Sequence, residues 1–116
     1  MKRVILIAAA FACCAGTARG ANPMASLFGN TLTVVGPEGT TVLWYKPDNT
    51  FTGIDEKSVR ISGTWQYAAD ELCSFVTTPV PKEKHCGRLG PHSVGDKWEA
   101  TRPNGAKVHL SLTAGT

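Results

Sequence analysis

The sequence predicts an all-β domain, a small antiparallel barrel or sandwich of about six to eight strands. Two observations predict it. Turn-forming residues interrupt the chain at short intervals, at Gly36–Gly39, Lys46–Asn49, Ser62–Gly63, Pro79–Pro81, Gly87–Pro91 and Pro103–Gly105. Between these turns lie short segments rich in β-branched and aromatic residues, in which apolar and polar residues alternate as in half-buried strands.

The N-terminal part of the predicted domain combines one short helical turn with a hairpin. Pro23–Phe28 contains residues that tolerate a helical turn. A hairpin follows from Asn30–Val35 to Thr41–Lys46, with its turn in Gly-Pro-Glu-Gly-Thr. Leu43, Trp44 and Tyr45 make the second strand apolar on both faces, so we expect it to be central in the sheet.

The middle of the chain contains one stretch with two interpretations. Ser58–Ser62 alternates like a strand, but residues 64–78 contain no Gly or Pro. Their apolar positions also fit a helical stripe, formed by Trp65, Ala68, Ala69, Leu72 and Val76. We favour two strands, Gly63–Tyr67 and Leu72–Thr78, with a turn at Ala69-Asp70, because β-branched and aromatic residues crowd the second half.

The C-terminal part predicts a second hairpin. Trp98–Thr101 and Ala106–Leu112 flank Pro103-Asn104-Gly105, a strong turn signal. In the last strand Val108, Leu110 and Leu112 share one face, which leaves His109 on the polar face.

The N-terminus has the layout of a secretory signal peptide. Lys2 and Arg3 precede an apolar segment, Val4–Ala15, that is shorter than the roughly 20 residues of a membrane span. Gly16 and Ala18 occupy the small-residue positions of a cleavage site. We therefore expect residues 1–18 to be a signal peptide and residues 19–116 to be a single antiparallel β domain with no stable membrane span.

Three alternatives for the N-terminus stay open. The leader can remain as a membrane anchor, or cleavage can follow Ala21, although that places Arg19 at the minus-three position. A lipid anchor on Cys13 requires a large aliphatic residue three positions earlier, where the chain has Ala10.

Length and charge limit the classes of function. Removing residues 1–18 from the 116-residue chain leaves 98 residues, enough for one small domain. Without Lys2 and Arg3, the formal net charge falls from +3 to +1. Such a balance is not the electrostatic footprint of a nucleic-acid-binding protein or of one that binds anionic membranes.

Two cysteines, Cys73 and Cys86, remain in the mature chain, and an oxidising compartment favours a disulfide between them. Closing a loop of this size contributes roughly 3 kcal/mol in the chain-entropy model. A zinc site requires paired ligands at short spacing, whereas Cys73 is isolated. A catalytic Cys–His pair requires a free thiol. We therefore expect no metal and no cofactor.

Three stretches resemble a known group of proteins: YKPDNTFTG at residues 45–53, GTWQYAADELC at residues 63–73, and Gly-Asp-Lys-Trp at residues 95–98. They resemble small exported proteins of Gram-negative bacteria that belong to uncharacterised families. The Gly-x-Trp at Gly63–Trp65 is also similar to the opening strand of lipocalin and avidin-type barrels, although here it stands in the middle of the chain. The resemblance implies an antiparallel sheet or small barrel and supplies no activity.

Motifs of catalysis are weak in this sequence. It contains no G-x-S-x-G nucleophile elbow, and GPEGTT at residues 36–41 lacks the lysine of a phosphate-binding loop. His92, Ser93 and Asp96 lie on one Gly/Pro-rich loop, whereas triad members usually come from separate elements. We therefore predict that the protein is not an enzyme.

Two groups of residues are candidates for binding. Trp44, Trp65 and Trp98 either line a ligand pocket or fill the core, where aromatic rings dominate burial energetics. Lys82, Lys84 and Arg88 either contact an acidic partner or keep an edge of the sheet soluble.

The function we expect is an exported, non-catalytic β-domain that binds a small ligand, an envelope component or a protein partner. The alternative is a small hydrolytic or metal-dependent enzyme that uses His85, His92 or His109. The alternative requires at least two of these histidines to converge in a cleft.

Overall fold

A computed structural model describes residues 22–116, so the signal-peptide and Cys13 predictions lie outside the described residues. The described chain is all-β, as the sequence predicts. After a 3₁₀ turn at Pro23–Ser26 come β1 (Asn30–Gly36), β2 (Gly39–Tyr45), β3 (Thr50–Ile54), β4 (Arg60–Ala68), β5 (Glu71–Thr78), β6 (Glu83–Arg88), β7 (Lys97–Thr101) and β8 (Lys107–Ala114). Among the described residues no helix is long and apolar enough to cross a bilayer.

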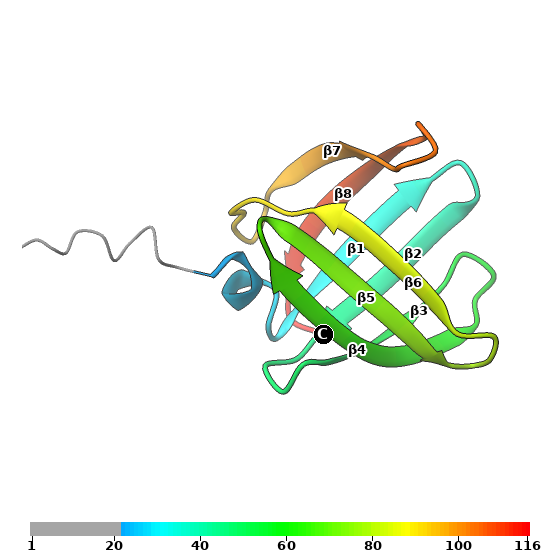
Figure 1. Ribbon diagram of the computed structural model, residues 1–116. Helices are drawn as coiled ribbons and strands as arrows, with labels where there is room; N and C mark the ends of the chain where they lie inside the picture. The colour runs from blue at the N-terminus through cyan, green and yellow to red at the C-terminus, as the bar shows by residue number, and fades with distance from the viewer. Residues whose placement is uncertain (1–21) are drawn as a thin grey trace, which may run out of the picture.

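The strands form one antiparallel sheet that curls into a half-barrel (Figure 1). Their order is β6-β5-β4-β3-β2-β1-β8-β7, a meander in which β8 returns to pair with β1. Within residues 22–116, the consecutive strands β6 and β7 are not hydrogen-bonded to each other and form the two edges of the sheet. Figure 1 shows them diverging from the loop that joins them.

The concave face of the sheet holds the core. Strand register places Leu32 opposite Leu43 on β2 and Leu112 on β8, and all three face inward. Met24 and Leu27, at most 1% exposed, close one end of the half-barrel from the 3₁₀ turn. The other buried members of the core cluster are Tyr45, Phe51, Trp65, Leu72, Val76 and Leu89.

Two glycines on the concave face allow the sheet to curl tightly. A Cβ atom on Gly63 would lie 1.8 Å from the backbone oxygen of Phe75, and one on Gly53 would lie 2.5 Å from that of Val42. Gly63 sits at a register shift between β4 and β5, a β-bulge whose extra residue, Thr77, belongs to β5. The predicted turn at Ser62–Gly63 is therefore wrong, because β4 runs through these residues without a break.

The middle of the chain confirms one prediction and contains two strands that the sequence did not predict. Residues 64–78 form the favoured hairpin, and Ala69 and Asp70, with φ of 54° and 66°, make its turn. The sequence interpretation did not place strands at β3 or β6. Gly53 interrupts the apolar alternation of β3, and β6 contains no aliphatic or aromatic residue.

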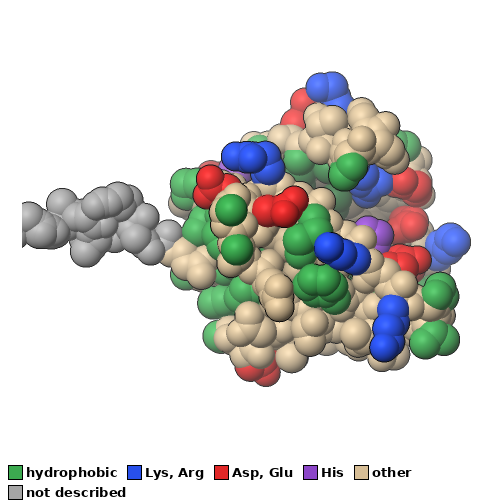
Figure 2. Space-filling view, viewed as in Figure 1, with side chains coloured by type: hydrophobic (Ala, Val, Ile, Leu, Met, Phe, Trp, Pro, Cys, Tyr) green, Lys and Arg blue, Asp and Glu red, His purple; other side chains and the backbone are tan. Residues whose placement is uncertain are grey.

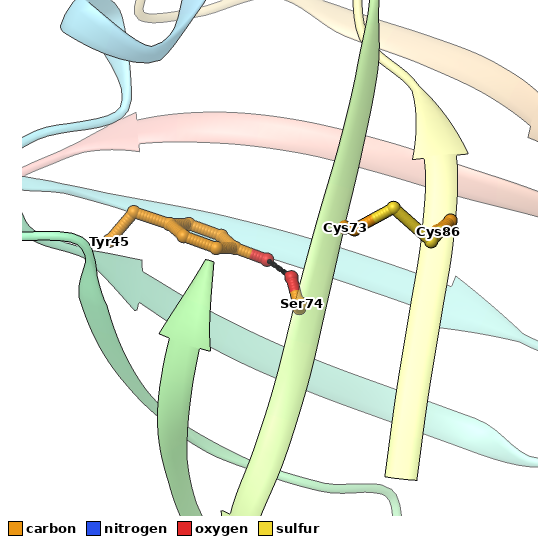
Figure 3. The surroundings of a disulfide bond; sticks show 4 residues. All are labelled: Tyr45, Cys73, Ser74 and Cys86. Carbon is orange, nitrogen blue, oxygen red and sulfur yellow. Dashed lines mark hydrogen bonds between the residues drawn. A yellow bond between two sulfur atoms is a disulfide. The ribbon is translucent and has the colours of Figure 1, made fainter. Parts of the chain in front are cut away.

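A buried polar pair crosses the core (Figure 3). The Tyr45 hydroxyl, on a residue only 3% exposed, lies 2.7 Å from the Ser74 hydroxyl of β5. Burial raises the pKa of Tyr45 to about 12, and the hydrogen bond with Ser74 opposes this shift in part. The phenol is therefore harder to ionise in the folded chain than in the unfolded chain, where its pKa is about 10.

This pair predicts a loss of stability in alkali. The contribution of neutral Tyr45 is fully present below pH 10 and declines as the pH rises towards 12, by about 1 kcal/mol at pH 11. Urea unfolding at pH 8 and pH 11 measures the decline. The Tyr45→Phe/Ser74→Ala variant is the control, and its stability should fall less over the same interval. An identical decline in both proteins would contradict a buried phenol.

Candidate functional site

A recess of about 540 Å³ opens at the end of the half-barrel that the 3₁₀ turn closes. We call it the rim recess. Three segments far apart in the sequence meet there: the 3₁₀ turn, the β2–β3 turn and the C-terminal half of β4. It is lined by Asn22, Phe28, Pro47, Asn49, Trp65, Gln66, Tyr67 and Ala68. None of these lining residues carries a formal charge.

Hydrogen bonds and packing hold the aromatic residues of the rim recess in place. The Trp65 indole N–H donates to the Lys46 carbonyl oxygen at 2.9 Å, and its ring lies 5.8 Å from the Phe28 ring. The Tyr67 hydroxyl donates to the Leu89 carbonyl oxygen at 2.7 Å. These rings have fixed positions before any ligand arrives, so binding does not carry the entropic cost of ordering them.

The amide side chains of the rim recess retain unused hydrogen-bonding capacity. The Asn49 amide nitrogen donates to the Trp65 carbonyl oxygen at 3.2 Å, and within the described chain its side-chain oxygen accepts no hydrogen bond. The Gln66 side chain makes none within residues 22–116. An amide offers two donors and one acceptor oxygen. Strand register places the Trp65 and Tyr67 rings on the concave face of β4 and the Gln66 side chain on its convex face, so these residues line the recess from opposite faces of the strand.

A second recess, of about 400 Å³, lies over β7, β8 and β1. It is lined by Val35, Lys97, Trp98, Glu99, His109, Leu110 and Ser111. Glu99 lies opposite His109 in the strand register, with Oε2 3.5 Å from Nδ1, and both side chains are more than half exposed. Ser111 shares this face, but within the described residues no hydrogen bond joins its hydroxyl to the His109 ring. A nucleophile–base pair is therefore not assembled there.

The three histidines lie on different elements and have different neighbours. The Nε2 atom of His85 lies 3.1 Å from Oε1 of Glu83 on the same strand. His109 pairs with Glu99 on the outer face of β7 and β8. His92, in the β6–β7 loop, stacks on the Trp98 ring with 3.5 Å between the ring centroids. Its Nδ1 atom lies 3.5 Å from Oδ2 of Asp96. Each ring thus contacts a different carboxylate, and neither recess found among the described residues is lined by more than one of the three histidines.

His92, Ser93 and Asp96, the three residues of a possible catalytic triad, help to order the β6–β7 loop. The Asp96 carboxylate accepts a hydrogen bond from the backbone N–H of Ser93 at 2.9 Å, and so it caps the loop. The Ser93 hydroxyl makes no hydrogen bond to His92 among the described residues. The three residues order the chain segment that leads into β7.

The three tryptophans do not line one pocket. Trp44 lies on the convex face, where its indole N–H donates to the Thr31 hydroxyl at 2.9 Å. Trp65 is in the core and reaches the rim recess, and Trp98 packs between the core and His92. Of the three, the structure brings only Trp65 together with polar groups at the rim recess.

Cys73 and Cys86 form the predicted disulfide, which joins β5 to β6 on the convex face (Figure 3). Their sulfur atoms and the Glu71 carboxylate lie within 4.8 Å of one another. Sulfur atoms bonded to each other are not thiolates, so this group lacks the ligands of a metal site.

The three basic candidates lie on or beside β6 and are exposed. The Nη2 atom of Arg88 lies 3.9 Å from Oδ2 of Asp70. The Lys84 ammonium lies 5.9 Å from the Phe75 ring centroid. Lys82 and Lys84 make no ion pair within the described part of the chain. Figure 2 shows basic and acidic side chains interspersed on this face, without a continuous basic patch.

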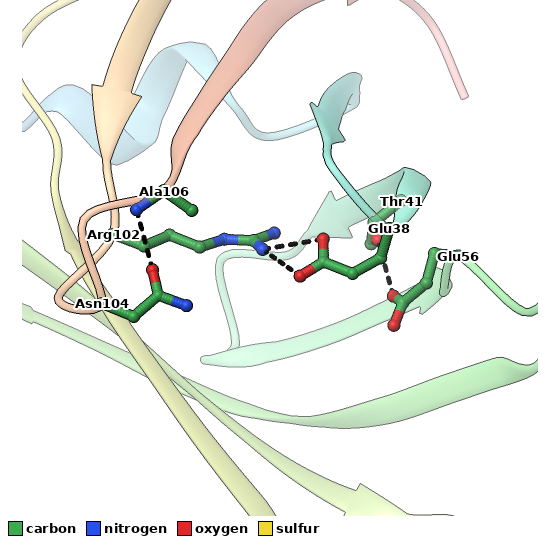
Figure 4. A network of polar contacts seen from close by, with 6 residues as sticks. All are labelled: Glu38, Thr41, Glu56, Arg102, Asn104 and Ala106. Carbon is green, nitrogen blue, oxygen red and sulfur yellow. Dashed lines mark hydrogen bonds and ion pairs between the residues drawn. The ribbon is translucent and has the colours of Figure 1, made fainter.

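An ion pair joins two hairpin turns whose residues do not line the rim recess (Figure 4). Arg102, after β7, donates to both carboxylate oxygens of Glu38 at 2.8 and 2.9 Å. These hydrogen bonds hold the pKa of Glu38 below its ordinary value. Thr41 contacts Glu56 beside this pair, and Asn104 orders its turn by accepting from the Ala106 N–H. The network links separate turns and has no feature of a reactive site.

Comparisons with protein-family models, with curated proteins and with solved structures return no match to this chain. The candidate sites therefore rest on their own geometry. The sequence interpretation missed Phe28, Asn49 and Gln66, because these residues carry no motif and come together only when three separate segments fold.

Proposed function

We propose that the protein is an exported, non-catalytic binding domain whose small-ligand site is the rim recess. The observation that carries the proposal is the lining itself: it combines fixed aromatic rings with amide groups that have free hydrogen-bonding capacity, and no residue that lines it has a charged side chain. The signal peptide that the sequence predicts and the disulfide support export.

The lining favours a neutral, hydroxyl-bearing ligand, such as a short saccharide. Sugar hydroxyls both donate and accept hydrogen bonds, which matches the amides of Asn49 and Gln66. The C–H faces of a sugar ring are apolar and can lie against the aromatic rings. A charged ligand would lose its hydration without a compensating charge in the recess.

The three tryptophan indole N–H groups give a residue-specific test. We expect neutral trisaccharides (cellotriose, maltotriose or chitotriose) to shift the Trp65 indole signal in ¹H–¹⁵N spectra. The Trp44 and Trp98 signals should stay in place, because these residues lie outside the rim recess. Equal shifts of all three signals, or no shift with any sugar, would count against the proposal.

Two variants locate the site. Gln66→Ala removes an amide that lines the recess and should weaken saccharide binding several-fold, by about 1 kcal/mol for one hydrogen bond. Thr64→Ala, an exposed position of the same strand that does not line the recess, is the matched control and should bind as the parent does. The dissociation constants come from the same titrations. Equal weakening by both variants would place the ligand elsewhere.

A further inference from the structure

The edge strand β6 differs from the other strands because its side chains contribute almost nothing to the core. Cys86 is half-buried, and every other residue of β6 is exposed. Glu83 and His85 face the concave side, yet their side chains are 57% and 67% exposed. A Cβ atom on Gly87 would meet no described atom within 4 Å. Packing therefore does not hold β6 in place, and its position depends on hydrogen bonds and the disulfide.

The geometry of the disulfide identifies which backbone groups of β6 face away from β5. The Cα atoms of Cys73 and Cys86, opposite in register, are 4.0 Å apart. Directly opposed residues that close together form a non-hydrogen-bonded pair, since hydrogen-bonded pairs are about 5.5 Å apart. The N–H and C=O groups of Cys86 thus point away from β5. The alternation of the strand gives the same outward direction to the backbone groups of Lys84 and Arg88.

The charges of this edge disfavour pairing with a second copy of the chain. An antiparallel copy of β6 would place Lys84 opposite itself or opposite Arg88, or Lys82 opposite Arg88, depending on the register. Like charges directly opposite each other destabilise a strand pair. An acidic strand would instead meet Lys84 and Arg88 on the convex face, where Lys84 makes no ion pair within the described residues.

We propose that the free edge of β6 is a docking site for an extended acidic segment of a partner protein, which pairs with it as a further strand of the sheet. Backbone hydrogen bonds to Lys84, Cys86 and Arg88 provide the affinity, as in other cases of strand addition. Acidic residues at alternate positions of the partner provide the selectivity. The disulfide holds the strand ready, so binding does not have to order it. This proposal is independent of the rim recess.

Three labelled peptides test the proposal on the oxidised protein by fluorescence anisotropy. The probe is Val-Glu-Val-Glu-Val-Glu-Val, and a peptide with lysine in place of glutamate tests the charge. The third peptide keeps the glutamates but has all of its backbone amides N-methylated, so neither of its edges can donate hydrogen bonds to β6. We expect only the first to bind, with affinity that falls as salt is added. If the N-methylated peptide bound as well as the first, charge alone would explain the binding and the proposal would be overturned. It would also be overturned if none of the three peptides bound.

Variants at position 84 separate backbone pairing from charge. Lys84→Gln keeps the outward N–H and should weaken binding about three- to tenfold through the lost charge. Lys84→Pro removes the N–H as well, at a position where an edge strand tolerates proline, and should abolish binding. Lys107→Gln, an exposed lysine of β8, is the control. Equal affinities of the Gln and Pro variants, or a dimer of the parent chain through β6 in sedimentation, would contradict the proposal.

Discussion

Replacement of Gly63 by alanine is expected to prevent folding or to lower the free energy of unfolding by about 3 kcal/mol or more, at the upper end of overpacking effects. The added Cβ atom would lie 1.8 Å from the Phe75 carbonyl oxygen, and that oxygen belongs to the backbone of the neighbouring strand. The collision cannot be relieved by a side-chain rotation. Thermal unfolding followed by circular dichroism measures the loss.

Gly87→Ala is the matched control for this experiment. Gly87 is also a strand glycine, its φ is not positive, and an added Cβ atom would meet no described atom within 4 Å. Alanine there should leave the melting temperature unchanged or raise it slightly, because alanine restricts the unfolded chain more than glycine does. Similar melting temperatures for the two variants would show that β4 and β5 do not approach each other as described.

The second large effect is expected from loss of the disulfide. Replacing Cys73 and Cys86 together by alanine should lower the free energy of unfolding by about 2–4 kcal/mol. The loss should be concentrated in β6, because this strand buries so little of its own surface. Urea unfolding of the parent and of the double variant gives the difference.

A reducing agent provides the internal check on the second prediction. Dithiothreitol should lower the stability of the parent to that of the double variant and leave the variant unchanged. If the reduced parent remained as stable as the oxidised protein, the bridge would not support β6.

The sequence predicted the fold class and most strands because alternation and turn chemistry are local signals. Pro103-Asn104-Gly105 and Ala69-Asp70 mark hairpins that form as expected. Gly63 was misinterpreted as a turn, because in a sequence a glycine at a bulge looks the same as a glycine in a loop. Strand β6 was missed because it lies at an edge and carries no apolar pattern, so only its ladder with β5 identifies it.

The candidate sites were less accessible to sequence reasoning. The pairing of Cys73 with Cys86 followed from the cysteine count, and the exposure of Lys82, Lys84 and Arg88 from their charge. The three tryptophans look equivalent in the sequence, yet strand register sends Trp44 to the convex face and Trp65 to the concave face. Register over many strands is a long-range property, and a one-residue slip reverses the direction of every side chain.

The central claim is that the half-barrel is open and that the disulfide holds β6 as its free edge. Residue-resolved amide hydrogen exchange of the oxidised protein tests it most directly. We expect slow exchange at His85 and Gly87, whose N–H groups face β5, and fast exchange at Lys84, Cys86 and Arg88, whose N–H groups face the open edge. Slow exchange at all five amides would mean that another strand covers this edge, and the account would be contradicted.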